Sequence, residues 1–415
     1  MTDKKIRVCA ILVVHDGATW LPEVVAALAS QTRAVDRTIA IDTGSQDSST
    51  KLLSGARIQF ISIDRGDGFG TAVSTAVKNL PAVSDEYEDW IWLIHDDCAP
   101  SPNSLKALLT AVSDRPNVAM VGPKIIGWNK RDHLLEAGIS IASQGTRWTG
   151  MENDEFDQGQ HDGIKEVLSV STAGALIRRE VYEELGGFDE NLAIFRDDVD
   201  FGWRLRMAGH SVLVTTDAVV RHVQAAFNER RSVDVDEAFL NHAHLLDRRN
   251  AAYVLLANSS WWMLPGLSLQ ILGAAVFRAI GYLLAKLPGY AGDEILAMVQ
   301  LFIRPDLLRT ARKNRKATKL LSARVAKPFM PTQIMQIRGA KDDVINWFRE
   351  KFFPAPAMHL NDSISNEDDE LLFKKVAKFN DRPLLKDLLQ EFNYPFENII
   401  FRYDTKLYTT TTVRN

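Results

Sequence analysis

Short, almost entirely apolar runs alternate with segments of helical spacing throughout residues 1–235, and this alternation constrains the fold more than any other feature. The first run, Ile6–Val14, is apolar nearly throughout, which is typical of a strand that helices bury on both faces. Trp20–Ser30 follows it with apolar residues at helical spacing. The pattern predicts an α/β fold with a Rossmann-like, mostly parallel central sheet flanked by helices.

The same alternation continues along the chain. It predicts strands at Thr38–Ile41, Ile58–Ile63, Trp90–Ile94, Val118–Gly122, Ser211–Thr215 and Ala218–Val220, and helices at Thr71–Leu80, Ser101–Val112 and Asp197–Met207. Residues 127–166 are rich in Gly, Asp and Gln and are predicted to form a long, irregular surface insertion. In open parallel sheets ligands bind outside the carboxyl ends of the strands, so polar residues at those ends are the candidate site.

The charge balance excludes one large class of partner. The 415 residues carry 49 Lys and Arg against 53 Asp and Glu, a net charge of −4, so there is no basic excess for binding nucleic acid. Cys9 and Cys98 are too few for a disulfide framework, which favours a reducing compartment. The length predicts two or three domains.

Carboxylates follow two of the predicted strands. Asp42 ends the second strand, where it can accept hydrogen bonds from a nucleobase or ribose, or form an Asx turn that caps the next helix. The buried strand Trp90–Ile94 ends in His95-Asp96-Asp97. Adjacent carboxylates repel each other there unless a divalent cation compensates, although they can also be a charge pair before a helix.

A second acidic group opens the helix Asp197–Met207. Asp197, Asp198 and Asp200 lie in its first turn, where the helix dipole favours acids. Three carboxylates exceed what capping needs, and one of them can act as a general base toward a hydroxyl. His222, in an apolar segment, is by itself more typical of a core or surface histidine than of a metal ligand.

The composition changes after residue 249. The 28 residues between Arg249 and Arg278 carry no formal charge, which is enough for a membrane-spanning helix, although Pro265 and Gly266 interrupt them. From Arg304 to Lys327 there are nine Lys and Arg and one acid, a basic cluster that is typical of the cytosolic side of a membrane. The alternative is an amphipathic helix pair that packs on the first domain.

Taken in order, these motifs resemble the inverting family 2 glycosyltransferases with the GT-A fold. The resemblance covers about the first 255 residues. In the first half, the opening strand and loop match at Ile11–Asp16, the Q-T…D-T-G-S-x-D signature at Gln31–Asp47, and the G-F-G turn at Gly68–Gly70. In the second half, the D-x-D position falls at His95–Asp97, the G-A-x-x-I-R-R…L-G-G-F-D-E segment at Gly174–Glu190, and the E-D-x-D motif at Asp197–Asp200. Arg248-Arg249-Asn250 also resembles actinobacterial-type, membrane-associated members with C-terminal membrane helices.

The resemblance implies a role for each matching residue. Asp97 and His222 would bind a divalent metal, Mg²⁺ or Mn²⁺, and Asp198 would be the catalytic base. The donor, a nucleotide-diphosphate sugar, would lie against His15, Asp42, Gly68, Phe69 and Asp96, with Asp42 on the base and Asp96 near the ribose or sugar. His95 is a departure, because the family often has Asp or Asn there.

The implied reaction is a single displacement that inverts the anomeric carbon and transfers the sugar to a glycan or lipid-linked acceptor in cell-envelope synthesis. We expect a catalytic domain over residues 1–235 on the cytoplasmic side of the membrane, a membrane-associated region over 236–303, and a basic segment with a mixed tail over 304–415. A non-catalytic sugar-nucleotide-binding or membrane scaffold protein of the same fold is the alternative. A dinucleotide oxidoreductase is disfavoured because the turn Gly66–Gly70 lacks the G-x-G-x-x-G fingerprint.

Overall fold

The computed structural model describes residues 4–152, 155–224, 243–332, 334–336, 400–403 and 406–409. The chain forms two compact units, Met1–Ile337 and Arg338–Asn415. In the second unit the described residues form one antiparallel hairpin, β13 (Ile400–Tyr403) with β14 (Lys406–Thr409). The predicted domain boundary between residues 235 and 236 lies outside the described residues, so the predicted division of the chain remains a prediction.

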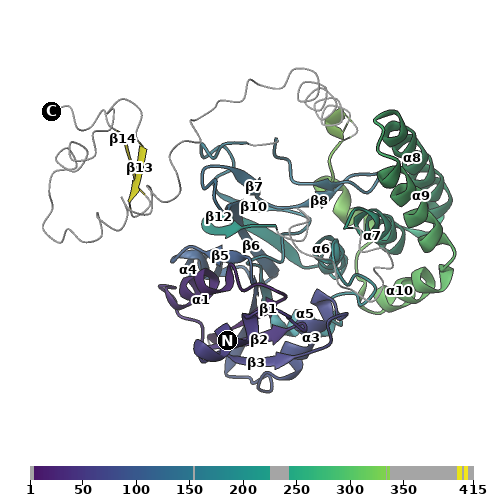
Figure 1. Cartoon of the computed structure of the whole chain (residues 1–415). Helices are drawn as coiled ribbons and strands as arrows, with labels where there is room; N and C mark the ends of the chain where they lie inside the picture. Colours follow the sequence, from purple (N-terminus) through teal and green to yellow (C-terminus); the bar gives the residue numbers. More distant parts are fainter. Residues whose placement is uncertain are drawn as a thin grey trace, which may run out of the picture. The chain divides into compact units, whose positions relative to one another are not determined.

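A ten-stranded sheet organises the first unit (Figure 1). Its main path runs β10-β12-β6-β11-β4-β1-β2-β3. These strands are Ile164–Glu166, Ser211–His222, Val118–Gly127, Leu176–Arg178, Tyr87–His95, Lys5–Val14, Arg37–Asp42 and Gln59–Ser62. Strands β3, β2, β1 and β4 pair in parallel, as do β6 and β12, whereas β11 pairs antiparallel with both β4 and β6. The mostly parallel sheet that the sequence predicts is confirmed.

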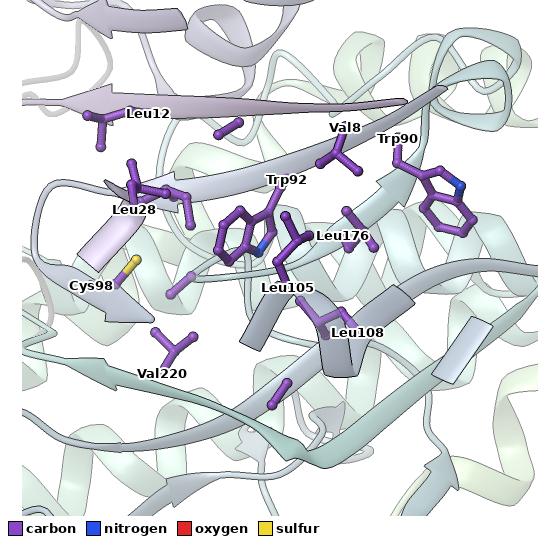
Figure 2. Packing of buried hydrophobic residues seen from close by; sticks show 14 of the residues in the cluster. Val8, Leu12, Leu28, Trp90, Trp92, Cys98, Leu105, Leu108, Leu176 and Val220 are labelled. Carbon is purple, nitrogen blue, oxygen red and sulfur yellow. The ribbon is translucent and has the colours of Figure 1, made fainter. Parts of the chain in front are cut away.

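Alternate residues of the central strands enter two separate cores. Val8 and Leu12 of β1 face one core together with Trp92 of β4, whereas Ile11 and Leu93 face the other. Three helices close the first core: α1 (Leu21–Ala29), α2 (Ser49–Gly55) and α4 (Ser104–Val112). Figure 2 shows part of this core. The second is closed by α3 (Phe69–Lys78), α5 (Arg179–Glu184) and α6 (Asp197–Met207). Helices on both faces explain why β1 is apolar from Val8 to Val14.

The segment 127–166 is only in part the irregular surface insertion that its composition predicts. It contains β7, β8, β9 and, at its end, β10; the first three are Leu134–Glu136, Ser140–Ile141 and Arg147–Trp148. Ile139 and Ile141 are buried in a third core with α6 and the C-terminal helices. The two predicted strands at residues 211–220 also form one strand, β12, which is irregular between Thr215 and Val219.

Four helices complete the first unit: α7 (Ala243–Asn258), α8 (Leu264–Leu284), α9 (Pro288–Phe302) and α10 (Pro305–Thr318). Helix α9 packs on both α7 and α8, and α7 packs on α6 and α10 (Figure 1). Together with the short helix Trp261–Met263, α8 forms the one helix of the described residues that is long and apolar enough to cross a membrane, and 22% of its apolar window is buried. The C-terminal helices therefore belong to the same compact unit as the sheet.

Candidate active site

The carboxyl ends of β1, β2 and β4 bring three predicted site segments together. In the sheet register Val14 of β1 pairs with Asp42 of β2, and Val13 of β1 pairs with His95 of β4. His15 follows β1 directly, and Asp96 and Asp97 follow β4. The polar residues that end these strands consequently share one edge of the sheet, which is where parallel sheets bind ligands.

Two of these side chains and one from β12 form a cluster that can hold a metal ion, called the metal-type cluster below. His95, Asp97 and His222 each offer one ligand atom, and these atoms lie within 4.8 Å of one another. His222 ends β12 and pairs in register with Cys98 of the short strand β5 (Cys98–Pro100), which carries it from far along the chain to the end of β4. Two imidazoles and a carboxylate are a ligand set for a first-row divalent metal. His95, where the family often has Asp or Asn, thus offers one of the three possible ligand atoms.

The side chains of this cluster lie close to one another. The distance from His222 Nε2 to Asp97 Oδ1 is 3.2 Å, and the rings of His95 and His222 lie 5.5 Å apart. Burial lowers the pKa of His222, but the neighbouring Asp97 carboxylate outweighs it, and the pKa is raised above its ordinary value. Protons therefore compete with a metal for this histidine at low pH.

Asp96 turns away from this cluster toward the loop after β1. It accepts a hydrogen bond of 2.7 Å from the backbone N–H of His15. A Cβ built on Gly17 would lie 2.2 Å from Asp96 Oδ2, so the backbone can approach this carboxylate only because residue 17 is glycine. The two adjacent acids consequently have different surroundings, and Asp97 is the one that reaches the histidines.

Asp42 is buried at the end of β2, and its side chain bonds to the loop that follows without capping α2. Its Oδ1 accepts a 3.2 Å hydrogen bond from the N–H of Ser45. The loop beside it is tied to the loop after β1 by Asp16, which pairs with Arg65 at 2.6 Å and accepts from the N–H of Gln46. The result is a small, cross-linked pair of loops next to the metal-type cluster.

The glycine-rich turn lies against the same cluster. The Phe69 ring packs edge-on to His95, with ring centroids 4.9 Å apart. The backbone N–H of Phe69 donates to the carbonyl of Ala193. A Cβ on Gly68 would lie 2.4 Å from that carbonyl oxygen, so glycine is required for the close approach. This turn therefore joins the cluster to the loop that leads into α6.

The three acids that open α6 have three different surroundings. Asp200 points inward, fully buried, and pairs with Arg204 at 2.7 Å and with Arg315 of α10 at 2.6 Å. Burial raises its pKa, but Arg315 and Arg204 outweigh this and lower the pKa to about 2. Asp197 is also buried, and burial, followed by the charge of Asp198, raises its pKa to about 8. Asp200 is therefore a structural residue.

Asp198 is held by a residue that the sequence does not single out. Arg147 Nη1 donates to Asp198 Oδ2 at 2.7 Å, and its Nη2 donates to both oxygens of Glu136 at 3.1 Å. The Glu136–Arg147 pair is therefore fixed beside the start of α6. Both residues come from the segment 127–166, whose composition conceals their role.

The start of α6 is conformationally special. Phe195 and Arg196 have φ of 61° and 69°, a left-handed conformation that side chains other than glycine rarely adopt. Arg196 is fixed there by two hydrogen bonds to Asp247 of α7, of 2.6 and 2.8 Å. Asn250 of α7 donates to the carbonyl of Ile194 at 2.7 Å. Helix α7 therefore fixes the bend that aims the acids.

Comparison with known proteins gives a consistent result. The sequence model of the family described as "Glycosyltransferase like family 2" matches residues 19–235, more than half of the chain. The N-acetylglucosaminyl-diphospho-decaprenol L-rhamnosyltransferase of Mycobacterium tuberculosis is 26% identical over 264 residues, which are 57% of this chain and 81% of that protein. The O-antigen chain rhamnosyltransferase RfbN of Salmonella typhimurium is 27% identical over 221 residues, 52% of this chain and 66% of that protein.

A solved structure resembles the chain in fold. The crystal structure of GalNAc-T7 with UDP, GalNAc and Mn²⁺ superposes with a TM-score of 0.51 over 85% of this chain and 59% of that chain. The sequence identity is 13%, so the likeness concerns the fold alone.

Proposed function

Because the chain belongs to the family 2 glycosyltransferases, we propose that it is a metal-dependent, inverting enzyme that moves a sugar from a nucleotide-diphosphate sugar to a lipid-linked or glycan acceptor. The membership makes it a glycosyl-transfer enzyme with the GT-A fold. The observation that carries the proposal is the cluster His95, Asp97 and His222, which lies at the strand ends.

The donor set supports a divalent cation in this cluster. Asp97 and His222 would hold it, with His95 as a third ligand. Two imidazoles beside one carboxylate favour Mn²⁺ over Mg²⁺, because Mg²⁺ prefers oxygen ligands. When bound, such a cation offsets the charge that builds on the leaving diphosphate.

The loops beside the cluster would bind the rest of the donor. Asp42 and the loop after His15 would contact the nucleotide base, and Asp96 would lie near the ribose or sugar. Gly68 and Phe69, whose ring packs on His95, would line the same donor site. These assignments follow the family motifs residue by residue, and they are consistent with the shared position of the strand ends.

Asp198 would take the proton from the acceptor hydroxyl. Its Oδ2 accepts a hydrogen bond from Arg147 and its Oδ1 accepts one from the N–H of Val199, and each carboxylate oxygen has a further lone pair that can accept from the acceptor hydroxyl. The oxygen then attacks the anomeric carbon from the face opposite the diphosphate, which inverts its configuration.

The relatives support the acceptor and the location. The printed name of the M. tuberculosis relative specifies a diphospho-decaprenol acceptor, and other relatives are O-antigen and galactofuranosyl transferases. We propose a polyprenol-type or glycan acceptor in cell-envelope synthesis. The catalytic unit would act at the cytoplasmic face of the membrane, in line with the basic cluster of residues 304–327.

A donor screen tests the proposal. Purified full-length protein is heated with a panel of nucleotide-diphosphate sugars, in Mn²⁺ and in a chelator. We expect one donor class to raise the melting temperature in Mn²⁺ only. When a lipid-linked or glycan acceptor is added, the glycoside formed from that donor should have the anomeric configuration opposite to that of the donor. Stabilisation without product formation would identify a binding protein instead, and stabilisation that survives the chelator would exclude the metal.

A further inference from the structure

The outward surface of α8 and α9 is apolar to an unusual degree. Between Leu264 and Phe302, all of which the structure describes, the exposed side chains that carry a charge or an amide are Gln270 and Lys286. Several large apolar side chains are exposed by more than half: Leu269, Phe277, Ile280, Leu283 and Leu284. Phe277 and Leu284 are 79% and 81% exposed. A continuous surface of this kind marks an interaction site.

The charged residues of the same helices face inward. Arg278 of α8 donates two hydrogen bonds of 2.9 Å to Glu294 of α9, whose side chain is fully buried. The same carboxylate lies 3.1 Å from Arg248 and 3.3 Å from His244, both of α7. Ion pairs between side chains thus join the inward face of the helix pair to α7, while the outward face has almost no charged side chains.

Helix α7 is in turn part of the catalytic unit. Asn258, at its end, donates to Asp200 of α6 at 2.7 Å, and Asp247 holds Arg196. If α8 crossed a bilayer while still packed on α9 and α7, the charged side chains of α7 and the buried pair Arg278–Glu294 would enter the hydrocarbon core. Charges at that depth are costly. Helix α9, with 15 residues or about 22 Å, is also shorter than the hydrocarbon core of about 30 Å.

A basic rim adjoins the apolar surface. The segment 304–327 exposes seven cationic side chains against one acidic one: Arg304, Arg309, Lys313, Lys316, Lys319, Arg324 and Lys327 against Asp306. Arg324 lies over the ring of Trp262, 5.0 Å from its centre, so the rim and the apolar surface are contiguous. Trp261, beside it, is 76% exposed. Tryptophan and cationic side chains around an apolar face are typical of proteins that lie in a membrane interface.

We propose that the outward face of α8 and α9 lies in the plane of an anionic lipid bilayer, inserted into one leaflet without crossing it. Phe277 and Leu284 enter the acyl region, and the basic rim contacts the lipid headgroups. This inference deepens the proposed function, since it specifies how the enzyme reaches a lipid-linked acceptor. In-plane attachment differs from the membrane-spanning helices that the sequence leads us to expect. A spanning α8 would have to break the ion pairs that join it to the catalytic unit.

Vesicle binding tests the surface. Full-length protein is sedimented with phosphatidylcholine vesicles with and without phosphatidylglycerol. We expect binding that requires the anionic lipid and weakens in high salt. The double variant Phe277→Asp/Leu284→Asp should bind at least about tenfold more weakly, because two large apolar side chains no longer enter the bilayer. Val83→Asp, at an exposed apolar residue elsewhere, is the matched control and should bind like the wild type. Equal binding by the double variant would overturn the proposal.

A cysteine experiment separates in-plane from spanning attachment. Both native cysteines are buried, so Lys286→Cys, between α8 and α9, and Lys106→Cys, on α4, introduce single accessible thiols. On sealed anionic vesicles a membrane-impermeant maleimide added from outside should label both without detergent. Labelling of Lys286→Cys only after detergent, while Lys106→Cys reacts at once, would show that the helix pair crosses the bilayer.

Two readouts keep this proposal separate from the proposed function. The Phe277→Asp/Leu284→Asp variant should retain metal-dependent donor binding, because neither residue touches the strand-end cluster. If the wild type binds no sugar nucleotide yet docks on vesicles, the proposed function fails and the docking surface stands. If the wild type is a dimer that ignores vesicles and becomes a monomer in the double variant, a second copy covers this face and the docking proposal is wrong.

Discussion

Acidic residues that are neighbours in the sequence have different surroundings in this protein, because each one has a different hydrogen-bond or ion-pair partner. Asp96 meets a backbone N–H, whereas Asp97 meets His222. One helical turn similarly gives Asp198 an arginine from a distant segment and Asp200 two buried arginines. The sequence predicts which strand ends carry acids, because the apolar runs stop there. It cannot predict which acid of a group faces the site, since this depends on contacts such as that of Gly17 with Asp96.

The first prediction concerns the metal. Asp97→Ala should lose metal-dependent binding of the donor while the protein still folds, because the variant removes one of the three clustered groups that could hold a metal and relieves a repulsive acid pair. Calorimetric titration with donor in Mn²⁺ and in chelator measures this. Asp217→Ala, at an exposed acid of β12, is the matched control. Unchanged Mn²⁺ dependence in Asp97→Ala would move the metal elsewhere.

The second prediction concerns the base. Asp198→Asn should lower the transfer rate by about 10²–10⁴-fold and leave donor affinity nearly unchanged, because a general base contributes about that factor. Steady-state rates and donor titration separate the two effects. Asp197→Asn is the neighbouring control and should retain more activity. A fully active Asp198→Asn enzyme would place the base at another residue, and lost donor binding would place Asp198 in the donor site.

Asp197 supplies a prediction about pH. Its pKa is raised from 3.8 to about 8, so the folded protein keeps a proton that the unfolded chain has already released. The stability this provides is complete below about pH 4 and is lost as the pH rises through about 8. Asp197→Asn does not titrate, so its free energy of unfolding, relative to the wild type, should increase from pH 5 to pH 9. Denaturant unfolding at both pH values measures this, and a constant difference would contradict the raised pKa.

At the scale of elements, α10 is tied to α6 by a buried network. Arg315 contacts Asp200 at 2.6 Å, Asp189 at 2.7 Å and Asn258 at 3.0 Å. Each of these partners comes from a different element or loop, and Asp200 in turn holds Arg204. The basic segment that the sequence assigns to the membrane side therefore has one arginine that faces the interior.

Loss of that arginine should destabilise the protein strongly. Arg315→Met removes the buried cation that Asp189 and Asp200 share and leaves Asp200 with Arg204 and Asn258, and breaking a buried ion pair in this way costs about 3–5 kcal/mol. Denaturant unfolding at pH 7 measures the change. Lys316→Met, at an exposed neighbour in the same helix, should alter the free energy of unfolding by less than about 0.5 kcal/mol. Equal effects of the two substitutions would show that the network contributes nothing.

The elements themselves follow unevenly from the sequence. The helix Asp197–Met207 is predicted with the bounds that the structure has, and the central strands are predicted within a few residues. These elements bury apolar side chains at regular spacing, which is a local signal. The strands β7, β8 and β9 are two or three residues long and are held by pairing and by the third core. No periodicity can develop over such lengths, and for that reason Arg147 and Glu136 escape prediction.

At the scale of the whole molecule, the catalytic sheet and the C-terminal helices form one folding unit. We expect a chain that ends at residue 242 to fail to fold, because Asp200 and Arg196 lose their partners on α7 and α10. A chain that ends at residue 337 retains all of them and should unfold cooperatively. Circular dichroism during heating distinguishes the two, and cooperative unfolding of the shorter chain would show that residues 1–235 are an independent domain.

The outward apolar face of α8 and α9 also has a kinetic consequence. An enzyme held on a bilayer by that face meets a lipid-linked acceptor by lateral diffusion in two dimensions. Its turnover then depends on the number of acceptor molecules per unit area of membrane. Diluting the acceptor with inert lipid should slow the reaction, whereas diluting the whole suspension of vesicles at constant composition should leave the rate per bound enzyme unchanged.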